Sequence, residues 1–216
     1  MRTMLTETQI LQNREKFLTE LKSIPRQGMD NLIAWLDKTD FFTAPATSKY
    51  HGNYRGGLCE HTLDTLKCSM MLYETYMRTD LGENVPKNVA VNELKLACLL
   101  HDVRKVLMYY PQNKRKIDDN GVWHTVAGWV VKDLFPFGGS EKSIFYVGKF
   151  IELTGPEALA IRWCRGEGEL ATHLDVDYSA SLRQSMKLYP IVSIINEGKK
   201  MAMNLLGKHD EDVFLD

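Results

Sequence analysis

The chain has 216 residues, of which 44% are hydrophobic and 25% charged, and its formal net charge is −1. These values are ordinary for one globular domain and exclude a protein drawn to nucleic acid or to an anionic membrane by its overall charge. The N-terminus is too polar for a signal peptide, and no apolar run approaches the roughly 20 residues of a membrane helix. We therefore expect a single soluble domain over residues 1–216, located in the cytoplasm of a bacterium or, if the chain is viral, of its host.

The four cysteines are not arranged for disulfides or for a zinc finger. No CxxC pair occurs, and each cysteine stands in a stretch with helical character. We expect reduced thiols, as in a cytosolic compartment, at Cys59, Cys68, Cys98 and Cys164.

The N-terminal part predicts two helices and a long loop. Apolar residues recur at helical spacing over residues 8–24 and again over 28–38, with Pro25 between the two runs. Residues 41–57, which follow, are rich in Gly, Ser and Thr. A loop of this length inside a compact domain is often functional. We expect the two helices to pack on the rest of the domain.

Two longer helices and a hairpin are predicted in the middle of the chain. The helices run from Gly57 to about Arg78 and from about Val89 to Met108, and a polar connector joins them. Residues 112–131 surround an Asn-Gly pair, and both of these residues tolerate positive φ. We therefore predict a small two-stranded ribbon there.

Helices return in the last third, over about 140–153, 155–166 and, as one or two helices, 179–206. Thr154 to Glu157 reads as a capping box with Pro in the first turn. We expect residues 167–178 to form a loop and those after 206 a loose tail. The predicted fold is thus an all-α, mainly helical bundle with a two-stranded β-hairpin near residues 112–131.

The pair His101-Asp102, which follows an apolar run, is the strongest chemical signal. Imidazole nitrogen and carboxylate oxygen are ligands of divalent metals that activate water. A lone His-Asp dipeptide is more often a capping or surface pair. Its context, however, includes the segment His51 to Thr62, in which glycines precede Leu58 and His61.

Taken together, these segments resemble one branch of the HD superfamily of metal-dependent phosphohydrolases. That branch includes bacterial 3′-to-5′ exoribonucleases and many bacterial and phage proteins. The resemblance covers about residues 30–205 in the same order. It also rests on residues 40–47, 113–123, 136–143, 160–163 and 190–192.

The resemblance implies three metal ligands, His61, His101 and Asp102, of which His101 and Asp102 also carry the catalytic role. Asp102 would hold the attacking water. Three further positions at which the family has metal-site side chains are Gly139, Cys164 and Lys199 in this chain. The metal site that the resemblance implies is therefore degenerate, which favours a pseudoenzyme.

The lysine is the most consequential of these differences. An ammonium a few ångströms from a divalent cation repels it by several kcal/mol at an intermediate effective dielectric. We therefore predict that Lys199 takes the place of the ion and forms a buried salt bridge with Asp102. Two alternatives stay open: Lys199 turned to solvent, with one ion weakly held, and Cys164 acting as a soft ligand for zinc.

Positive side chains gather in or beside the same motifs. Such a set can clamp a phosphate through charge-assisted hydrogen bonds, although each residue taken alone is more often ordinary solvated surface. For His51, pocket lining and a structural hydrogen bond are equally favoured. The predicted ligand-binding residues are His51, Arg55, Arg104, Lys105, Lys142, Arg165 and Lys199.

These expectations combine into one function and two alternatives. We expect a divergent HD-like protein that binds a nucleotide or another phosphorylated small molecule, with hydrolysis weak or lost. It would have no cofactor or one weakly bound divalent metal (Mn, Mg, Ni, Co or Zn), and no extended nucleic-acid surface. The first alternative is an active mononuclear phosphohydrolase on nucleotide phosphate esters, in which Lys142 or Arg104 neutralises the leaving group. The second is a protein-interaction module with a filled pocket.

Overall fold

The computed structural model describes residues 5–83, 85–117, 120–166 and 176–208. It is mainly helical and contains one two-stranded antiparallel hairpin, as the sequence predicts. The two N-terminal helices are α1 (Glu7–Lys22) and α2 (Met29–Leu36). Helix α1 begins at a capping box. The Thr6 side chain accepts a hydrogen bond from the Gln9 backbone N–H, and the Gln9 side chain accepts one from the Thr6 backbone N–H. Among the described helices, none has both the length and the apolar character needed to cross a membrane.

The two central helices are α3 (Gly57–Arg78) and α4 (Val91–Leu100). Helix α3 has the predicted bounds, but the prediction that the next helix reaches Met108 is wrong. Helix α4 ends before Asp102, and a short 3-10 helix, η1 (Val103–Lys105), follows. Adjacent residues of an α-helix point about 100° apart. Because the helix ends at Leu100, the side chains of His101 and Asp102 can both turn into the interior, where each has 0% exposure.

A strained residue carries the chain from η1 into the hairpin. Leu107 has a φ of 55°, in the left-handed region that non-glycine residues rarely adopt. Its backbone N–H donates to Asp40 Oδ1 at 2.7 Å. The Asp40 carboxylate therefore holds the turn that places the start of the hairpin beside Lys105.

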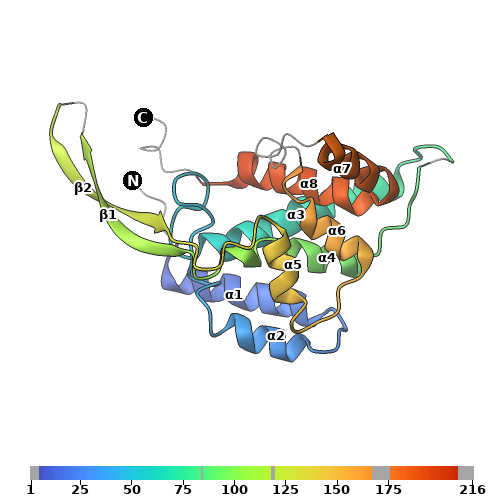
Figure 1. Ribbon diagram of the computed structural model, residues 1–216, viewed down its shortest axis with the longest axis horizontal. Coiled ribbons are helices and arrows are strands. Elements are labelled where there is room, and N and C mark those ends of the chain that lie inside the picture. The colour runs from blue at the N-terminus through green and yellow to red at the C-terminus, as the bar shows by residue number, and fades with distance from the viewer. Residues whose placement is uncertain (1–4, 84, 118–119, 167–175, 209–216) are drawn as a thin grey trace.

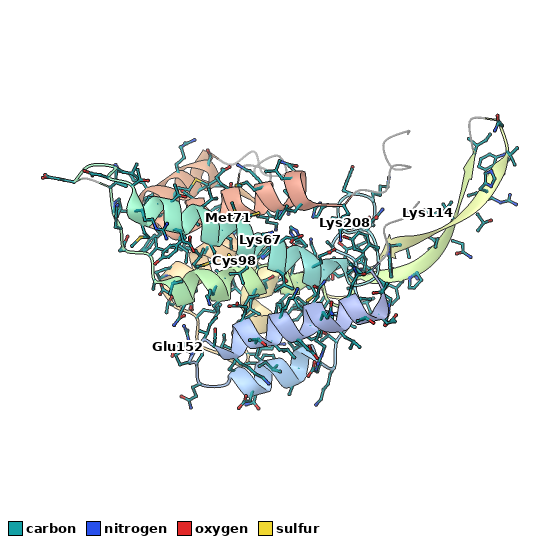
Figure 2. All side chains as sticks on the ribbon, turned by 180° about the vertical axis from the view of Figure 1, so that it is seen from behind. Lys67, Met71, Cys98, Lys114, Glu152 and Lys208 are labelled. Atoms are coloured by element: carbon teal, nitrogen blue, oxygen red, sulfur yellow. The ribbon has the colours of Figure 1, made fainter. Side chains whose placement is uncertain are left out.

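The hairpin consists of β1 (Tyr109–Ile117) and β2 (Trp123–Val131), with Asn113 opposite Ala127. It begins three residues earlier than predicted. Figure 1 shows it projecting from one end of the helical body, and Lys114 marks its outer part in Figure 2. Its base is attached to the loop before α3, because Tyr109 Oη lies 3.4 Å from Ala46 O and Trp129 Nε1 donates to Asn53 O at 2.8 Å.

The C-terminal part adds four helices and a π-helical turn. The predicted helix over 140–153 is shorter, since α5 ends at Val147. The predicted helix over 155–166 ends at Arg162. The capping box at Thr154 and Glu157 is confirmed. The expected loop at 167–178 is helical from residue 176, while residues 167–175 and the tail 209–216 lie outside the described residues. The elements are α5 (Glu141–Val147), α6 (Gly155–Arg162), α7 (Val176–Leu188), α8 (Pro190–Met201) and η3 (Ala202–Leu206).

Helices α3 and α4 form the middle of the body. In Figure 1, α1 and α2 lie on one side of them, and α7 and α8 on the other. The largest contacts between helices join α3 to α8 and to α4, and α4 to α6. The core is built from fully buried side chains such as Phe17, Phe41, Leu94, Leu99 and Ile161. This packing brings the start of α3, the end of α4 and the middle of α8 to one place.

The crossing of α3 and α8 depends on the absence of a side chain at Gly198. A Cβ built there would lie 2.1 Å from Ser69 Oγ and 2.8 Å from Ser69 Cα, which is buried backbone. We expect Gly198→Ala to force the helices apart and to lower the free energy of unfolding by about 1–3 kcal/mol. Urea denaturation would measure this loss. The control is Gly155→Ala, because a Cβ there meets nothing within 4 Å; equal losses for both variants would contradict the prediction.

Candidate functional site

The candidate site lies where α3, the end of α4 and α8 meet. His61 comes from α3, and His101 and Asp102 follow α4. His61 Nε2 lies 3.7 Å and His101 Nε2 3.4 Å from Asp102 Oδ2. The His51 ring, from the loop before α3, lies 4.7 Å from the His61 ring between centroids. The structure thus brings together the three residues that the sequence predicts as metal ligands.

The orientation of the His101 ring follows from its hydrogen bond. His101 Nδ1 lies 2.7 Å from Cys98 O, and a carbonyl oxygen only accepts, so Nδ1 carries the proton. Burial, together with the Lys199 charge, lowers the pKa of His101 and keeps the ring neutral. Its Nε2 lone pair therefore faces the Asp102 carboxylate, and a positive group is needed beside these two acceptors.

Lysine ammonium groups supply that positive charge. Lys105 Nζ lies 2.7 Å from Asp102 Oδ2, and Lys199 Nζ lies 3.4 Å from Oδ1. Arg104 Nε is also 3.4 Å from Oδ1. The predicted salt bridge between Asp102 and Lys199 is confirmed, but Lys105, which the sequence suggested as a ligand-binding residue, is the nearer partner. Lys105 also donates a hydrogen bond to Ala46 O at 2.7 Å, which ties the site to the loop before α3.

These charges set the protonation states. Burial alone would raise the pKa of Asp102, but the charges of Lys105 and Lys199 hold it well below its ordinary value. Burial lowers the pKa of Lys105 to about 8, because it outweighs the attraction of Asp102. Burial and the Lys105 charge lower the pKa of His61 well below its ordinary value, so this ring is neutral too. One buried carboxylate therefore faces two buried lysines.

The donors suit a divalent cation, but the charges do not. His61, His101 and Asp102 offer ligand atoms within 4.8 Å of one another. Among the described residues, no hydrogen-bond partner reaches His61 Nε2 or His101 Nε2. The ammonium of Lys105, however, lies beside the very oxygen that would coordinate an ion. With Lys199 on the other oxygen, the three ionised side chains sum to a positive charge, which opposes a tightly held cation.

The other two degenerate positions add no ligand to this group. Cys164 is buried, with Sγ 3.7 Å from Lys199 Nζ and 3.6 Å from Ser140 Oγ. Gly139 has no side chain and is followed directly by Ser140 at the start of α5. The lysine thus lies between the thiol of Cys164 and the carboxylate of Asp102.

A cleft of about 370 Å³ opens over this network. Five of the seven predicted ligand-binding residues line it: His51, Arg104, Lys105, Arg165 and Lys199. No described lining residue is acidic. Sequence reasoning missed Thr47, Tyr109, Lys200 and Met203, which also line the cleft.

Tyr109 was missed because the hairpin was expected to begin after it. Its position at the base of β1 turns its ring into the wall of the cleft. Burial, more than the charge of Asp102, raises the pKa of Tyr109 to about 12, so the phenol stays neutral. Lys200 was detectable, since it follows Lys199 on α8.

The structure places the two other predicted ligand-binding residues elsewhere. Lys142 is buried and pairs with Asp133 at 2.6 Å, with its ammonium 5.8 Å from the centroids of the Phe135 and Tyr146 rings. Arg55 pairs with Glu7 on the surface. Neither residue lines the cleft.

A larger, shallower groove of about 980 Å³ runs between α1 and α3. Its described lining mixes acidic residues such as Glu15 and Glu20 with basic ones such as Lys16 and Lys67. Lys95 pairs with Glu20 there at 2.8 Å. This mixture favours no particular ligand charge, and we place the candidate site at the smaller cleft.

Half-buried Asp64 lies one helical turn beyond Glu60 on α3 and gives a prediction about pH. Burial and the Glu60 charge raise its pKa from 3.8 to about 6. The folded state thus favours the protonated carboxyl of Asp64. The protonated group contributes its whole stabilisation below about pH 4, and this stabilisation is lost as the pH rises through about 6. We expect Asp64→Asn to stabilise the protein by about 1 kcal/mol at pH 7.5, after discounting for solvent screening, and to have no effect near pH 4. Urea denaturation at the two pH values tests this, and an equal gain at both would contradict it.

Comparisons of the chain with protein-family profiles, with characterised proteins and with solved structures gave no match.

Proposed function

We propose that this chain binds a phosphorylated small molecule, such as a nucleotide, in the cleft over Asp102, and that its hydrolytic activity is weak or lost. The observation that carries the proposal is the cationic lining of this cleft above a carboxylate that is already paired. The proposal includes descent from metal-dependent phosphohydrolases of the HD superfamily, on the strength of the sequence resemblance and of the clustering of His61, His101 and Asp102.

The charge of the cleft supports an anionic ligand. Arg104, Lys105, Arg165, Lys199 and Lys200 line it, and no described lining residue is acidic. Lys105 and Lys199 face Asp102 behind the lining, and Lys200 pairs with Glu197 at 2.8 Å. Arg and Lys donors form strong charge-assisted hydrogen bonds with phosphate oxygens. A volume of about 370 Å³ lies within the range of small-molecule sites, and so open a cleft does not favour the alternative of an interaction module with a filled pocket.

The same lysines support the loss of hydrolysis. A water-activating site needs Asp102 as a ligand or as an acceptor for the water. Here both of its oxygens face ammonium groups, at 2.7 Å and 3.4 Å. The carboxylate is thus already engaged by the protein's own cations.

Calorimetric titration tests the proposal, with inorganic phosphate and a panel of nucleoside mono-, di- and triphosphates as probes. We expect at least one of these compounds to bind, with an affinity that falls as salt concentration rises. The double variant Lys200→Gln/Arg165→Gln should weaken binding about tenfold or more. The matched control, Lys22→Gln/Lys38→Gln, removes the same charge from exposed positions on α1 and just after α2 and should not weaken binding. Failure of every compound to bind would refute the proposal.

The second candidate is an active phosphohydrolase that uses one weakly held ion. The buried ring nitrogens His61 Nε2 and His101 Nε2, which have no hydrogen-bond partner among the described residues and could coordinate an ion, favour it. Elemental analysis and phosphate release with manganese, magnesium, nickel, cobalt or zinc separate the two candidates. Stoichiometric metal together with turnover that Asp102→Ala abolishes would select the hydrolase.

A further inference from the structure

The ribbon formed by β1 and β2 has an edge on each side that borders no further strand. Among the described residues, its sheet contains these two strands and no other. Figure 1 shows the ribbon projecting from the helical body. A two-stranded ribbon is only marginally stable in water, and a third strand or a packed face stabilises it. A further strand at either edge would therefore add stability.

A hydrogen bond at the base of the ribbon shows which backbone groups point to these edges. The Lys132 N–H donates to Met108 O at 2.9 Å, and Tyr109 pairs with Val131 next along the ladder. In an antiparallel ladder, hydrogen-bonded pairs alternate with pairs whose backbone groups point away from the partner strand. The odd-numbered residues of both strands therefore direct their N–H and C=O groups outward. On β2 these residues are Trp123, Thr125, Ala127, Trp129 and Val131.

The outer edge of β1 is protected against pairing. Pro111 is one of its outward-facing residues, and proline has no N–H to donate to a neighbouring strand. The sequence Lys114-Arg115-Lys116 adds three positive charges to the same strand. Proline and charged residues, lysine above all, are the features by which proteins prevent association at exposed strands.

The outer edge of β2 has none of these features. Its sequence, WHTVAGWVV, contains no Pro, Asp, Glu, Lys or Arg. Trp123 is 63% exposed and Val131 47% exposed. Ile117, which is opposite Trp123 and shares its face of the ribbon, is 57% exposed. A long, exposed and uncharged edge strand of this kind is a template for another strand.

We propose that the added strand is β2 of a second copy of this chain, so that two ribbons form one four-stranded sheet in the order β1-β2-β2-β1. A strand with an open edge is complementary to itself when the second copy runs antiparallel across a two-fold axis. This order leaves the protected β1 strands at the outer edges, about 14 Å apart at three strand spacings. Their positive charges then lie beyond a Debye length of each other at physiological salt and repel weakly.

Full overlap of the two nine-residue strands defines the register. Ala127 of one copy then lies opposite Ala127 of the other, and Thr125 lies opposite Trp129. Trp123 likewise lies opposite Val131, so aromatic and β-branched side chains meet on one face of the sheet. Each hydrogen-bonded pair exchanges two bonds, and the four pairs beside the axis contribute about eight, close to the number in a typical protein interface.

The oligomeric state of the full chain tests the proposal. Sedimentation over roughly 1 to 100 µM protein should show a dimer. Ala127→Lys places like charges directly opposite each other and should weaken the dimer at least about tenfold. The matched control is Asn113→Lys, because Asn113 is exposed, lies opposite Ala127 in the ladder and faces the protected edge. This control should remain a dimer.

Disulfide trapping tests the same interface through its register. The four native cysteines are buried, so Ala127→Cys supplies the accessible thiol. Across the axis the two Cα atoms at this position would lie about 5.5 Å apart, within the range of a disulfide. Copper-catalysed oxidation by air should therefore link the two copies. Asn113→Cys should not become linked, since its Cα atoms would lie about 14 Å apart.

Three results would each overturn the proposal, whatever binds in the cleft. The first is a wild-type chain that stays a monomer throughout this concentration range. The second is an Ala127→Lys variant that dimerises as tightly as Asn113→Lys. The third is equal cross-linking of the two cysteine variants.

Discussion

Replacing Asp102 by alanine is expected to lower the free energy of unfolding by about 3–5 kcal/mol, because it leaves two buried ammonium groups without their shared counter-charge. The side chains of Lys105 and Lys199 are only 8% and 6% exposed. Both lie at the wall of the cleft with little of their surface in contact with water. Urea denaturation at neutral pH, with and without a chelator, measures the loss.

An exposed pair supplies the control for this variant. Asp37 pairs with Arg14 at 2.8 Å, and both side chains are more than a third exposed. Asp37→Ala should therefore cost less than about 1 kcal/mol. If Asp102→Ala proved as mild as the control, the carboxylate would not hold the lysines as we infer. A wild-type stability that depended on metal, and fell with the chelator, would equally contradict the inference.

Replacing Lys199 by aspartate is expected to create a metal site. The change puts a carboxylate at the position where the resemblance implies a metal ligand, and it alters the local charge by two units. At an intermediate effective dielectric, such a change strengthens the binding of a divalent cation by at least about 3 kcal/mol, or roughly 100-fold. Titration with Mn²⁺, followed by elemental analysis after gel filtration, would show the gain.

The adjacent residue makes a matched control for this experiment. Lys200 is paired with Glu197 at 2.8 Å and is about half exposed, so Lys200→Asp changes the net charge equally but not the buried network. Its effect on Mn²⁺ affinity should be small. Equal affinities in the two variants, or a stoichiometric ion in the wild type, would show that Lys199 does not take the place of an ion. Phosphate release by Lys199→Asp would further show that the cleft still accepts a hydrolysable ester.

Much of the fold could be predicted because local signals mark its boundaries. Helix α3 begins after Gly56, whose φ is 86°, and the Asn-Gly pair lies between the two strands of the hairpin. The end of α4 could not be predicted, because the apolar pattern continues through Val103 and Val106, both buried. The helix ends where two polar side chains, His101 and Asp102, are buried together, and their partner Lys199 is distant in the sequence.

Some contacts of the candidate site could be predicted from the sequence, and others could not. The pairing of Asp102 with Lys199 was predicted because the resemblance implies that both residues lie at one site, where a buried carboxylate and a buried ammonium stabilise each other. The ion-pair partner of Lys142 could not be predicted, because the motif around Lys142 does not reveal that Asp133, nine residues earlier, lies 2.6 Å from its ammonium. Lys105 lies nearer to Asp102 than Lys199 does because the chain forms a 3-10 turn at residues 103–105. The periodicity of the sequence does not predict this turn.

The base of the hairpin has a mechanical consequence. Tyr109 is at once the first residue of β1 and part of the wall of the cleft, and its attachment to Ala46 is shared with Lys105. A displacement of the projecting ribbon would therefore also move Tyr109 in the wall of the cleft, and a molecule held in the cleft would in turn oppose that displacement.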